Sequence, residues 1–531
     1  MNIIPKPNNP PVLKTGFFTL PSQVCADTDP FKPWCVNAFV ERCSLTLETT
    51  KTKSNNWLRF LRDEKLPEEG YLLTVNEDGV TAQASCEKGI IWALTALAEL
   101  ADNAPSIPFL KMEDSPRYSH RGLNLDCSRH FFSADEVKKI IDQISRVKMN
   151  VLHWHLSDDQ GWRIESKKFP LLHEKCGVYY TQDEIRSVVE YAQIRGVQII
   201  PEIDMPGHTL GLLTAYPQYS CGGASVEYAV SGGIYNTILC PGKEETFNFL
   251  EELFEEICSL FPSDKFHLGG DEAPKDEWQS CPACRSRMEK ENIKNHEDLQ
   301  GYFSMRAAEI LQKFGKRPIF WNDVLLASNT PKDMIVQYWN PLFSKQIKNY
   351  IDEGKQFIYS DMFSLYLDYP HAMSPLKNVY NTQPVTGKIN REDTPGLLGF
   401  EACLWTEHIK ENKALERLLF PRIFAAAEIS WTREKDYGGF LSRLEAKLES
   451  IKKAGVSFTQ LENCNPKGKA RRREAVGFLV NTASAMPADV RSKSIKNTGM
   501  SKSIILKFFT EFLKPTDIPF LLFELKKNLK R

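Results

Sequence analysis

Short apolar runs alternate with longer helix-like segments through most of the chain. The helical spacing is clearest at 134–147, 183–195, 299–314 and 344–352. The apolar runs are Arg121–Cys127, Asn150–Ser157, Val197–Asp204, Lys265–Glu272, Arg317–Asp323, Met334–Asn340, Gln356–Phe363 and Leu397–Trp405. Buried parallel strands appear in a sequence as nearly continuous apolar runs of this kind. Eight strands alternating with helices predict an α/β fold, a (β/α)8 TIM barrel. An open, doubly wound sheet fits the same periodicity.

The residues that end these runs favour the barrel. Nearly every run stops at a cluster of charged, polar or aromatic side chains. The clusters are Asp126 with Ser128, Arg129 and His130; His153 and His155 with Asp158 and Asp159; Glu202 with Asp204; Asp271 with Glu272; Trp321 with Asp323; Tyr338 with Trp339; Asp361; and Trp405 with Glu407. Active sites of TIM barrels are built from the C-terminal ends of the strands. One mouth lined with charge and indole is therefore the expected result.

The first 114 residues have a different pattern, which predicts a small α+β domain. Residues 45–49 alternate with period two, and residues 71–75 and 80–85 flank a turn-rich tetrad, so they predict a hairpin. Residues 88–100 have helical spacing. The polar, proline-bearing stretch 102–108 is a candidate domain boundary. We therefore expect an N-terminal domain at 1–114 and a barrel at 115–460.

The remaining residues, 461–531, form a short basic C-terminal extension of unknown role. Residues 467–531 contain 15 Lys and Arg against 5 Asp and Glu, although the whole chain has a formal net charge of −1. A solvated basic appendage is the favoured interpretation. Apolar positions at 504–513 and 519–525 also allow a helix docked on the barrel. Nucleic-acid binding is disfavoured, because aromatic and glycine residues are not interleaved with the basic ones.

Composition narrows the class of protein further. The chain is 42% hydrophobic and 25% charged, as in ordinary globular proteins, and it contains no apolar stretch of the roughly 18 residues that a membrane span requires. The first residues show no basic segment followed by an apolar run, so we expect a cytoplasmic protein without a membrane partner. Cys281-Pro-Ala-Cys284 resembles half of a zinc ribbon. The chain has no second cysteine pair of matching spacing, so free thiols are favoured there.

The strongest chemical signal is Lys265-Phe-His-Leu-Gly-Gly-Asp-Glu-Ala-Pro274. Two glycines at the end of a predicted strand allow a tight bend beside a ligand. If Asp271 and Glu272 face one site, their repulsion raises one pKa, as general acid catalysis near neutral pH requires. The alternative without a catalytic role is that Asp271 and Glu272 form an exposed acidic turn or cap the N-terminus of a helix.

Three further groups accompany that pair. His153 and His155 form a His-x-His pair that suits a divalent-metal hydrolase, with His208 and His267 as available further ligands. The same segment carries two tryptophans and two aspartates, which suit a polar ring better. Asp204 and His208 can form a carboxylate–imidazole pair that orients an acid. Strand-end indoles that can stack on the apolar face of a sugar are Trp321, Trp339 and Trp405.

Taken in order, these motifs resemble the β-N-acetylhexosaminidases of glycoside hydrolase family 20. The resemblance covers about residues 1–460. It rests on Ile3-Ile-Pro-Lys-Pro7, Arg121-Gly-Leu-Asn-Leu-Asp-Cys-Ser-Arg-His-Phe131, His153-Trp-His-Leu-Ser-Asp-Asp-Gln-Gly-Trp-Arg163, Pro201-Glu-Ile-Asp-Met-Pro-Gly-His208, His267-Leu-Gly-Gly-Asp-Glu272, Tyr366-Leu-Asp368 and Leu404-Trp-Thr-Glu407. It implies the fold predicted above and exo-acting, retaining, substrate-assisted hydrolysis of terminal β-linked GlcNAc or GalNAc, without a metal or other cofactor.

The resemblance also implies a role for each site residue. Glu272 is the general acid and base, Asp271 orients the substrate's acetamido group, and Tyr366 donates a hydrogen bond to its oxygen. The pair Asp204 and His208 supports the acid. Expected substrate contacts are Arg121 at the C3 and C4 hydroxyls, Asp368 and Glu407 at outer hydroxyls, the walls Trp321, Trp339 and Trp405, and also His155 and Asp158. One departure concerns Asp323, the third residue of Trp321-Asn-Asp323. The family often has an acidic residue there, and because the Asp side chain is short, a contact from this position is in doubt. The expected partner is a glycan; the oligomeric state stays open.

Overall fold

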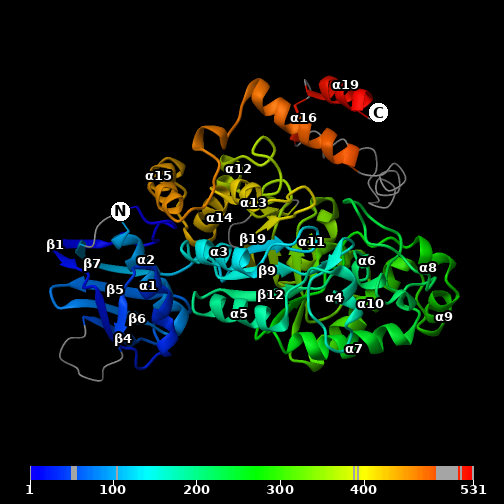
Figure 1. Cartoon of the computed structure of the whole chain (residues 1–531), viewed down its shortest axis with the longest axis horizontal. Coiled ribbons are helices and arrows are strands. Elements are labelled where there is room, and N and C mark those ends of the chain that lie inside the picture. The colour runs from blue at the N-terminus through cyan, green and yellow to red at the C-terminus, as the bar shows by residue number, and fades with distance from the viewer. Residues whose placement is uncertain are drawn as a thin grey trace.

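The computed structural model describes residues 2–48, 57–102, 106–386, 389–390, 394–485, 512–514 and 517–528. Its centre is a closed barrel of eight parallel strands in the order β12-β13-β14-β15-β16-β19-β8-β9 (Figure 1). The strands are β8 (His120–Asp126), β9 (Val151–His155), β12 (Gln198–Glu202), β13 (Lys265–His267), β14 (Arg317–Trp321), β15 (Ile335–Tyr338), β16 (Phe357–Tyr359) and β19 (Leu397–Leu404). Each lies within one of the eight apolar runs or overlaps it, so the TIM barrel is confirmed and the open sheet is wrong.

Helices surround the barrel, and the four predicted from spacing are present. They are α3 (Ala134–Ser145), α5 (Gln182–Gln193), α10 (His296–Lys313) and α11 (Ser344–Asp352). The others between residues 160 and 460 are α4 (Leu171–Cys176), α6 (Leu210–Leu213), α7 (Glu244–Cys258), α8 (Asp276–Ser280), α9 (Pro282–Lys290), α12 (Leu376–Asn381), α13 (Asn412–Leu419), α14 (Arg422–Trp431) and α15 (Tyr437–Lys453). Helix α5 begins with a reciprocal capping box between Thr181 and Glu184, which satisfies two backbone N–H groups.

The N-terminal part is a seven-stranded sheet in the order β1-β7-β5-β6-β4-β2-β3. Its elements are β1 (Val12–Thr19), β2 (Gln23–Asp27), α1 (Asn37–Arg42), β3 (Thr46–Glu48), β4 (Leu58–Arg62), β5 (Tyr71–Asn76), β6 (Gly79–Ala84), α2 (Glu87–Ala101) and β7 (Ser106–Asp114). The predicted hairpin and helix correspond to β5, β6 and α2. The stretch 102–108 is not a boundary as a whole, because β7 begins at Ser106 and pairs with both β1 and β5.

Buried charges join this sheet to the bottom of the barrel. The Arg121 guanidinium, at the start of β8, binds Glu69 and the carbonyls of Lys148 and Tyr118. The Lys148 ammonium lies 3.4 Å from an Asp114 oxygen, and both side chains are fully buried. A buried charge is tolerated only when it is paired and hydrogen-bonded, so these contacts fix the N-terminal part against the barrel.

The C-terminal extension contains helices α16 (Gly468–Ala485) and α19 (Ile518–Asn528), which lie over the barrel in Figure 1. Val476 and Val480 of α16 share a small core with Phe512, Ala372 and Met373. Leu521 of α19 joins the same core, so a helix at the predicted segment 519–525 is docked; the docking of α16 was not predicted, and the favoured solvated appendage does not describe these helices. Residues 504–511 of the predicted apolar segment lie outside the described residues.

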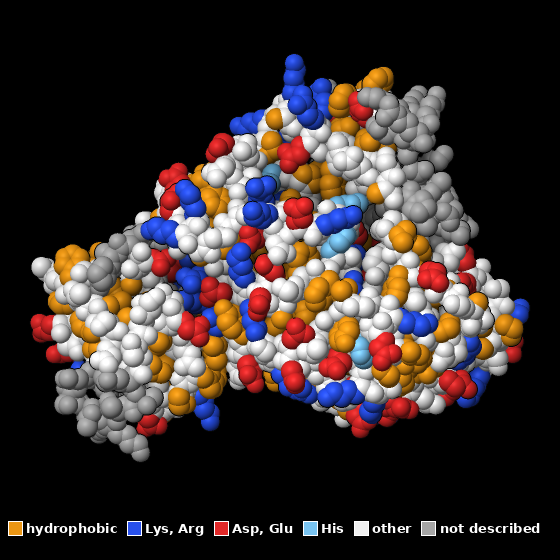
Figure 2. All heavy atoms as spheres, viewed as in Figure 1, with side chains coloured by type: hydrophobic (Ala, Val, Ile, Leu, Met, Phe, Trp, Pro, Cys, Tyr) orange, Lys and Arg blue, Asp and Glu red, His pale blue; other side chains and the backbone are white. Residues whose placement is uncertain are grey.

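Acidic and basic side chains are mixed over the face of the molecule shown in Figure 2. Within the described ranges, no helix has both the length and the apolar character needed to cross a membrane.

Candidate active site

The two adjacent carboxylates follow β13 on a sharply bent segment. Gly269 and Gly270 have positive φ values of 65° and 97°, and Glu272 has φ 47°. A Cβ atom on Gly269 would lie 1.7 Å from an Asp204 oxygen, so only glycine fits there. The Gly270 N–H donates to that Asp204 carboxylate at 3.0 Å. The bend turns both Asp271 and Glu272 toward His208, which confirms that they face one site.

His208 lies between two pairs of carboxylates. Its Nδ1 is 3.2 Å from an Asp158 oxygen and 3.3 Å from an Asp159 oxygen. Its Nε2 is 3.9 Å from Asp271 and 3.7 Å from Glu272. Burial opposes protonation, but Asp158, Asp159 and Glu272 together outweigh it and hold the pKa of His208 well above its usual value. The ring is therefore a cation at neutral pH.

This arrangement corrects one expected pairing. The carboxylates that bind His208 are those of Asp158 and Asp159, whereas Asp204 lies against Asp271 and the Gly270 backbone. Burial, reinforced by Asp271, raises the pKa of Asp204 well above its usual range. Asp204 contacts the neighbouring carboxylate directly, and it also lies within 4.8 Å of His208, whose charge opposes the rise in the pKa of Asp204.

Asp271 is a largely buried carboxylate with a raised pKa. Burial raises the pKa of Asp271 to about 6; His208 opposes the rise and Glu272 adds to it. Its side chain is 16% exposed, against 26% for Glu272. The more buried carboxylate therefore pays the larger desolvation cost of ionisation.

Asp158 and His155 support the site from below. Both are about 1% exposed. The Nε2 of His155 contacts Asp158 at 2.8 Å, and its Nδ1 contacts Glu202. Because protein partners occupy these polar atoms, the prediction that His155 and Asp158 contact substrate is corrected to a supporting position.

Arg121 is placed at the wrong end of the barrel for its predicted role. It begins a strand and points toward the N-terminal sheet, and it is 1% exposed. The arginine at the C-terminal mouth is Arg129, three residues after β8 ends. Arg129 lies 2.7 Å from Asp158 and 5.0 Å from the centre of the Trp405 ring. The direction of the strand could have identified Arg129 in place of Arg121, because only the C-terminal ends of barrel strands reach the active face.

Asp126, the last residue of β8, fixes two loops of the site. Its carboxylate accepts from the N–H groups of Ser128 and Arg129 at 2.8 and 3.1 Å. It also accepts from the backbone and hydroxyl of Thr406, both at 3.0 Å. One buried carboxylate therefore sets the positions of Arg129 and of the Trp405–Glu407 segment.

The predicted aromatic residues gather at the same mouth. Trp321 is 1% exposed and donates to Glu202 at 2.9 Å, which makes it the floor of the cluster. Its ring centre is 5.7 Å from that of Trp405. Trp339 stacks on Tyr366 at 6.3 Å and 18°. The Tyr366 ring in turn lies 6.2 Å from that of Trp405, so the cluster is continuous.

A backbone bridge positions Tyr366 and Asp368. The Leu367 N–H donates to the Cys403 carbonyl at 2.7 Å, beside the end of β19. Burial raises the pKa of Asp368 well above its usual range, and Glu407 adds to this. One oxygen of Asp368 is buried without a hydrogen-bond partner in the described structure. Such an atom is suited to accept from a ligand hydroxyl.

Asp323, the departure noted in the sequence, makes two contacts despite its short side chain. It accepts from the Trp339 indole N–H at 2.8 Å and from the Glu272 backbone N–H at 3.4 Å. Burial raises its pKa to about 8, and Asp271 and Glu272 add to the rise. Asp323 therefore links Trp339 to the segment that carries Asp271 and Glu272.

The metal hypothesis for His153 and His155 is not favoured by the interior of the barrel. Glu202 already interacts with His155, with His153 at 3.0 Å, with His267 at 2.9 Å and with the Trp321 indole at 2.9 Å. His153 also contacts Glu401 at 2.8 Å. A cation bound between His153, Glu202 and His267 would have to replace these contacts.

Comparisons with known proteins agree with this geometry. The family model described as glycosyl hydrolase family 20, catalytic domain, matches residues 118–434, and the model for domain 2 of the same family matches residues 1–115. A beta-hexosaminidase of Akkermansia muciniphila is 31% identical over 422 residues, covering 74% of this chain and 84% of the relative.

Solved structures of similar proteins have the same fold. A beta-N-acetylhexosaminidase from Bacteroides fragilis superposes with a TM-score of 0.79 at 31% identity, covering 88% of this chain and 99% of that one. An exo beta-N-acetylglucosaminidase from Vibrio harveyi, solved with N-acetylglucosamine, has a TM-score of 0.77 at 28% identity and covers 87% and 78%.

Some relatives extend beyond the matched region. Beta-hexosaminidases of Porphyromonas gingivalis and Vibrio furnissii are each 32% identical, and the matches cover 78% and 68% of this chain. The same matches span only 58% and 65% of the relatives' own lengths.

Proposed function

This chain belongs to glycosyl hydrolase family 20, and from that premise we propose that it is an exo-acting, retaining β-N-acetylhexosaminidase. Its substrate is the terminal β-linked GlcNAc or GalNAc of a glycan. The observation that carries this proposal is the pair Asp271 and Glu272 at the end of β13, both within 4 Å of the cationic His208. The adjacent aromatic cluster supplies faces on which a sugar ring stacks.

The first step uses the substrate as its own nucleophile. The acetamido oxygen attacks C1, the bond from C1 to the leaving oxygen breaks, and Glu272 gives its proton to that oxygen. An oxazolinium ring forms. Because the nucleophile is already attached, little entropy is lost in positioning it. Asp271 stabilises the positive charge on the acetamido nitrogen, and Tyr366 donates to its oxygen.

The second step reverses these roles. Glu272, now a carboxylate, takes a proton from water, and the water oxygen bonds to C1 as the oxazolinium opens. Two displacements at C1 retain the β configuration. Arg129, Asp368 and Glu407 bind ring hydroxyls in this proposal, and Trp321, Trp339 and Trp405 enclose the ring. His155, Asp158, Asp204 and His208 hold the acid and its partner in place.

A panel of aryl glycosides tests the proposal. We expect hydrolysis of the β-GlcNAc or β-GalNAc glycoside with a β-anomeric first product by NMR, and no reaction of the β-glucoside, which has no acetamido group. Glu272→Gln and Asp271→Asn should each lower kcat by roughly 10²–10⁴-fold. An α-anomeric first product, or a glucoside cleaved as fast as the N-acetylhexosaminide, would show that the mechanism is wrong.

A further inference from the structure

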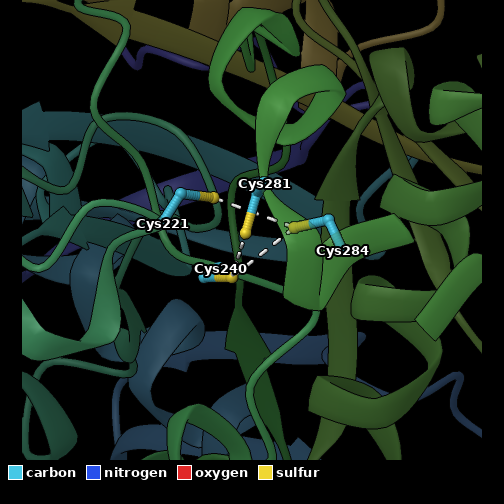
Figure 3. Close-up of side chains that lie close together, drawn as sticks. All are labelled: Cys221, Cys240, Cys281 and Cys284. Atoms are coloured by element: carbon cyan, nitrogen blue, oxygen red, sulfur yellow. Dashed lines mark hydrogen bonds between the residues drawn. The ribbon is translucent and has the colours of Figure 1, made fainter. Parts of the chain in front are cut away.

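Four cysteine thiols meet where two loops from the active site come together. Figure 3 shows Cys221 and Cys240 from the chain between β12 and α7, facing Cys281 and Cys284 of the next helical segment. Cys281 is the N-cap of α9, and Cys284 lies in its first turn. All four are free thiols; three are buried, and Cys221 is partly exposed. The partner pair that was missing from the sequence is therefore supplied by Cys221 and Cys240, which are 19 positions apart in the loop.

The spacing of the sulfur atoms is that of a metal tetrahedron. The distance between Sγ atoms is 3.8 Å from Cys221 to Cys284, 3.9 Å from Cys240 to Cys281 and 3.5 Å from Cys240 to Cys284. All four lie within 4.8 Å of one another. A zinc ion bound to four sulfurs at about 2.3 Å has tetrahedron edges of about 3.8 Å. A disulfide needs its two sulfurs about 2.05 Å apart. We propose that Cys221, Cys240, Cys281 and Cys284 bind one structural zinc ion.

The surrounding backbone is built for such a site. A Cβ atom on Gly242 would lie 2.3 Å from the Ala283 carbonyl carbon and 2.4 Å from the Cys284 nitrogen, so glycine alone lets the two chains approach.

A lysine secures the chain on the other side of the cluster. The Lys243 ammonium donates to the carbonyls of Gln218 and Ser220 at 2.8 and 2.6 Å. These two hydrogen bonds hold the turn that leads into Cys221. A surface hollow gives a path of entry; it is lined by Ser220, Cys221, Gly222, Thr237, Glu277 and Cys281.

The position of the cluster indicates a structural role. The 203–243 loop carries His208, and α8 and α9 follow Glu272 directly. The Trp278 indole donates to the Leu239 carbonyl at 3.1 Å, and the Thr237 hydroxyl donates to Glu277 at 2.7 Å. Four protein ligands leave no open coordination position, as in structural zinc sites. Zinc would therefore clamp together the loops that bring His208 to the catalytic pair.

Metal analysis of the purified full-length protein tests the site independently of any activity. We expect inductively coupled plasma mass spectrometry to find about one zinc ion per chain. A thiol-blocking organomercurial should release that zinc to a chromogenic indicator. Cys284→Ser should lower the zinc content at least about tenfold, because three ligands bind far more weakly than four. The matched control, Cys258→Ala, removes a buried thiol of α7 remote from the cluster and should keep its zinc.

A second measurement needs no variant, in case Cys284→Ser does not fold. Wild-type protein exchanged into Co²⁺ should show thiolate-to-cobalt charge-transfer bands and the intense visible bands of tetrahedral cobalt. Two results would overturn the proposal. One is wild-type protein that takes up neither zinc nor cobalt under reducing conditions. The other is intact-mass analysis of protein kept from air that finds disulfides among these four cysteines. Neither result depends on the glycosidase assay.

Discussion

Asp271 is held in a state that costs stability. Burial raises its pKa to about 6, about two units above the value of an unfolded chain, near 3.9. The folded protein therefore binds this proton more tightly than the unfolded one, and the stability that it contributes is lost as the pH rises through 6. The proposed mechanism needs the ionised form, so catalysis and stability make opposite demands on this residue.

We expect Asp271→Asn to be nearly inactive yet more thermostable than the wild type above pH 6. The amide has no charge to ionise, so the difference in Tm should grow between pH 4 and pH 8. Circular dichroism melts at several pH values measure it. Asp78→Asn, in an exposed turn, should follow the wild type throughout. Equal Tm values for Asp271→Asn and wild type at pH 8 would contradict the raised pKa.

The pH dependence of kcat/KM should reflect the ionisation of Asp271 as well. Burial raises the pKa of Asp271 to about 6. If ionised Asp271 stabilises the oxazolinium, kcat/KM should therefore fall tenfold per pH unit below about pH 6. A pH profile with an aryl N-acetylhexosaminide measures this limb. A profile that stays flat down to pH 4.5 would show that Asp271 need not be ionised.

Arg121 and Arg129 separate stability from substrate binding. Arg121→Met leaves Glu69 buried without its cation, and we expect it to lower the free energy of unfolding by about 3–5 kcal/mol. Its folded fraction should keep its kcat/KM. Arg129→Met should also destabilise the fold, because Asp158 loses its partner at 2.7 Å, but it alone should lower kcat/KM by at least about tenfold, because a hydroxyl ligand is lost at the mouth. Urea unfolding and steady-state kinetics on both variants decide whether the two roles are divided in this way.

At the scale of elements, the bend after β13 depends on one glycine. Gly269 and Gly315 have similar φ values, 65° and 70°, but only Gly269 faces a neighbour: nothing lies within 4 Å of a Cβ atom on Gly315. Gly269→Ala should therefore displace Asp204 and the catalytic segment and lower kcat by at least about 100-fold, the cost of misplacing a reacting group by about 1 Å.

Gly315→Ala is the matched control, since it carries the same left-handed strain of about 1–2 kcal/mol without a clash. We expect it to lower Tm slightly and to leave kcat unchanged. The comparison of kcat in the two alanine variants is the measurement. Equal losses in both would assign the effect to backbone strain instead of to the contact with Asp204.

The sequence allowed the barrel strands, the partner of His208 and the cysteine cluster to be predicted to different degrees. All eight barrel strands follow from apolar runs, because strands buried on both faces must be apolar. The partner of His208 was not predictable, since Asp158, Asp159 and Asp204 are all carboxylates at strand ends and only the loop path selects among them. The cluster of four cysteines was missed for a related reason: Cys221 and Cys240 have no regular spacing and meet Cys281 only through the fold.

At the scale of the whole molecule, the C-terminal extension is tied to the active face. Phe478 of α16 packs against Tyr369, with ring centres 5.8 Å apart, and Tyr369 packs at the same distance against Tyr366. The described part of the basic extension therefore supports the aromatic cluster from outside. Arg471 and Arg472 both pair with Asp517, which uses part of its positive charge internally.

Undocking α16 should loosen that support. Val476→Asp places a carboxylate in the shared core, where it costs several kcal/mol, and we expect α16 to become sensitive to protease and KM to rise. Asn481→Asp adds the same group at an exposed position of the same helix and should change neither. Limited proteolysis and steady-state kinetics measure the two outcomes. A rise in protease sensitivity without a change in KM would separate α16 from the sugar site.

The histidine and carboxylate network inside the barrel restricts how this sequence can diverge. Glu202 interacts with three histidines and an indole, and His153 is shared between Glu202 and Glu401. A neutral replacement of Glu202 or Glu401 leaves a buried histidine without its counter-charge. Substitutions here must therefore arrive in compensating sets, and homologues should differ at these positions together or not at all. We therefore expect the buried network beneath Asp271 and Glu272 to be inherited as one unit.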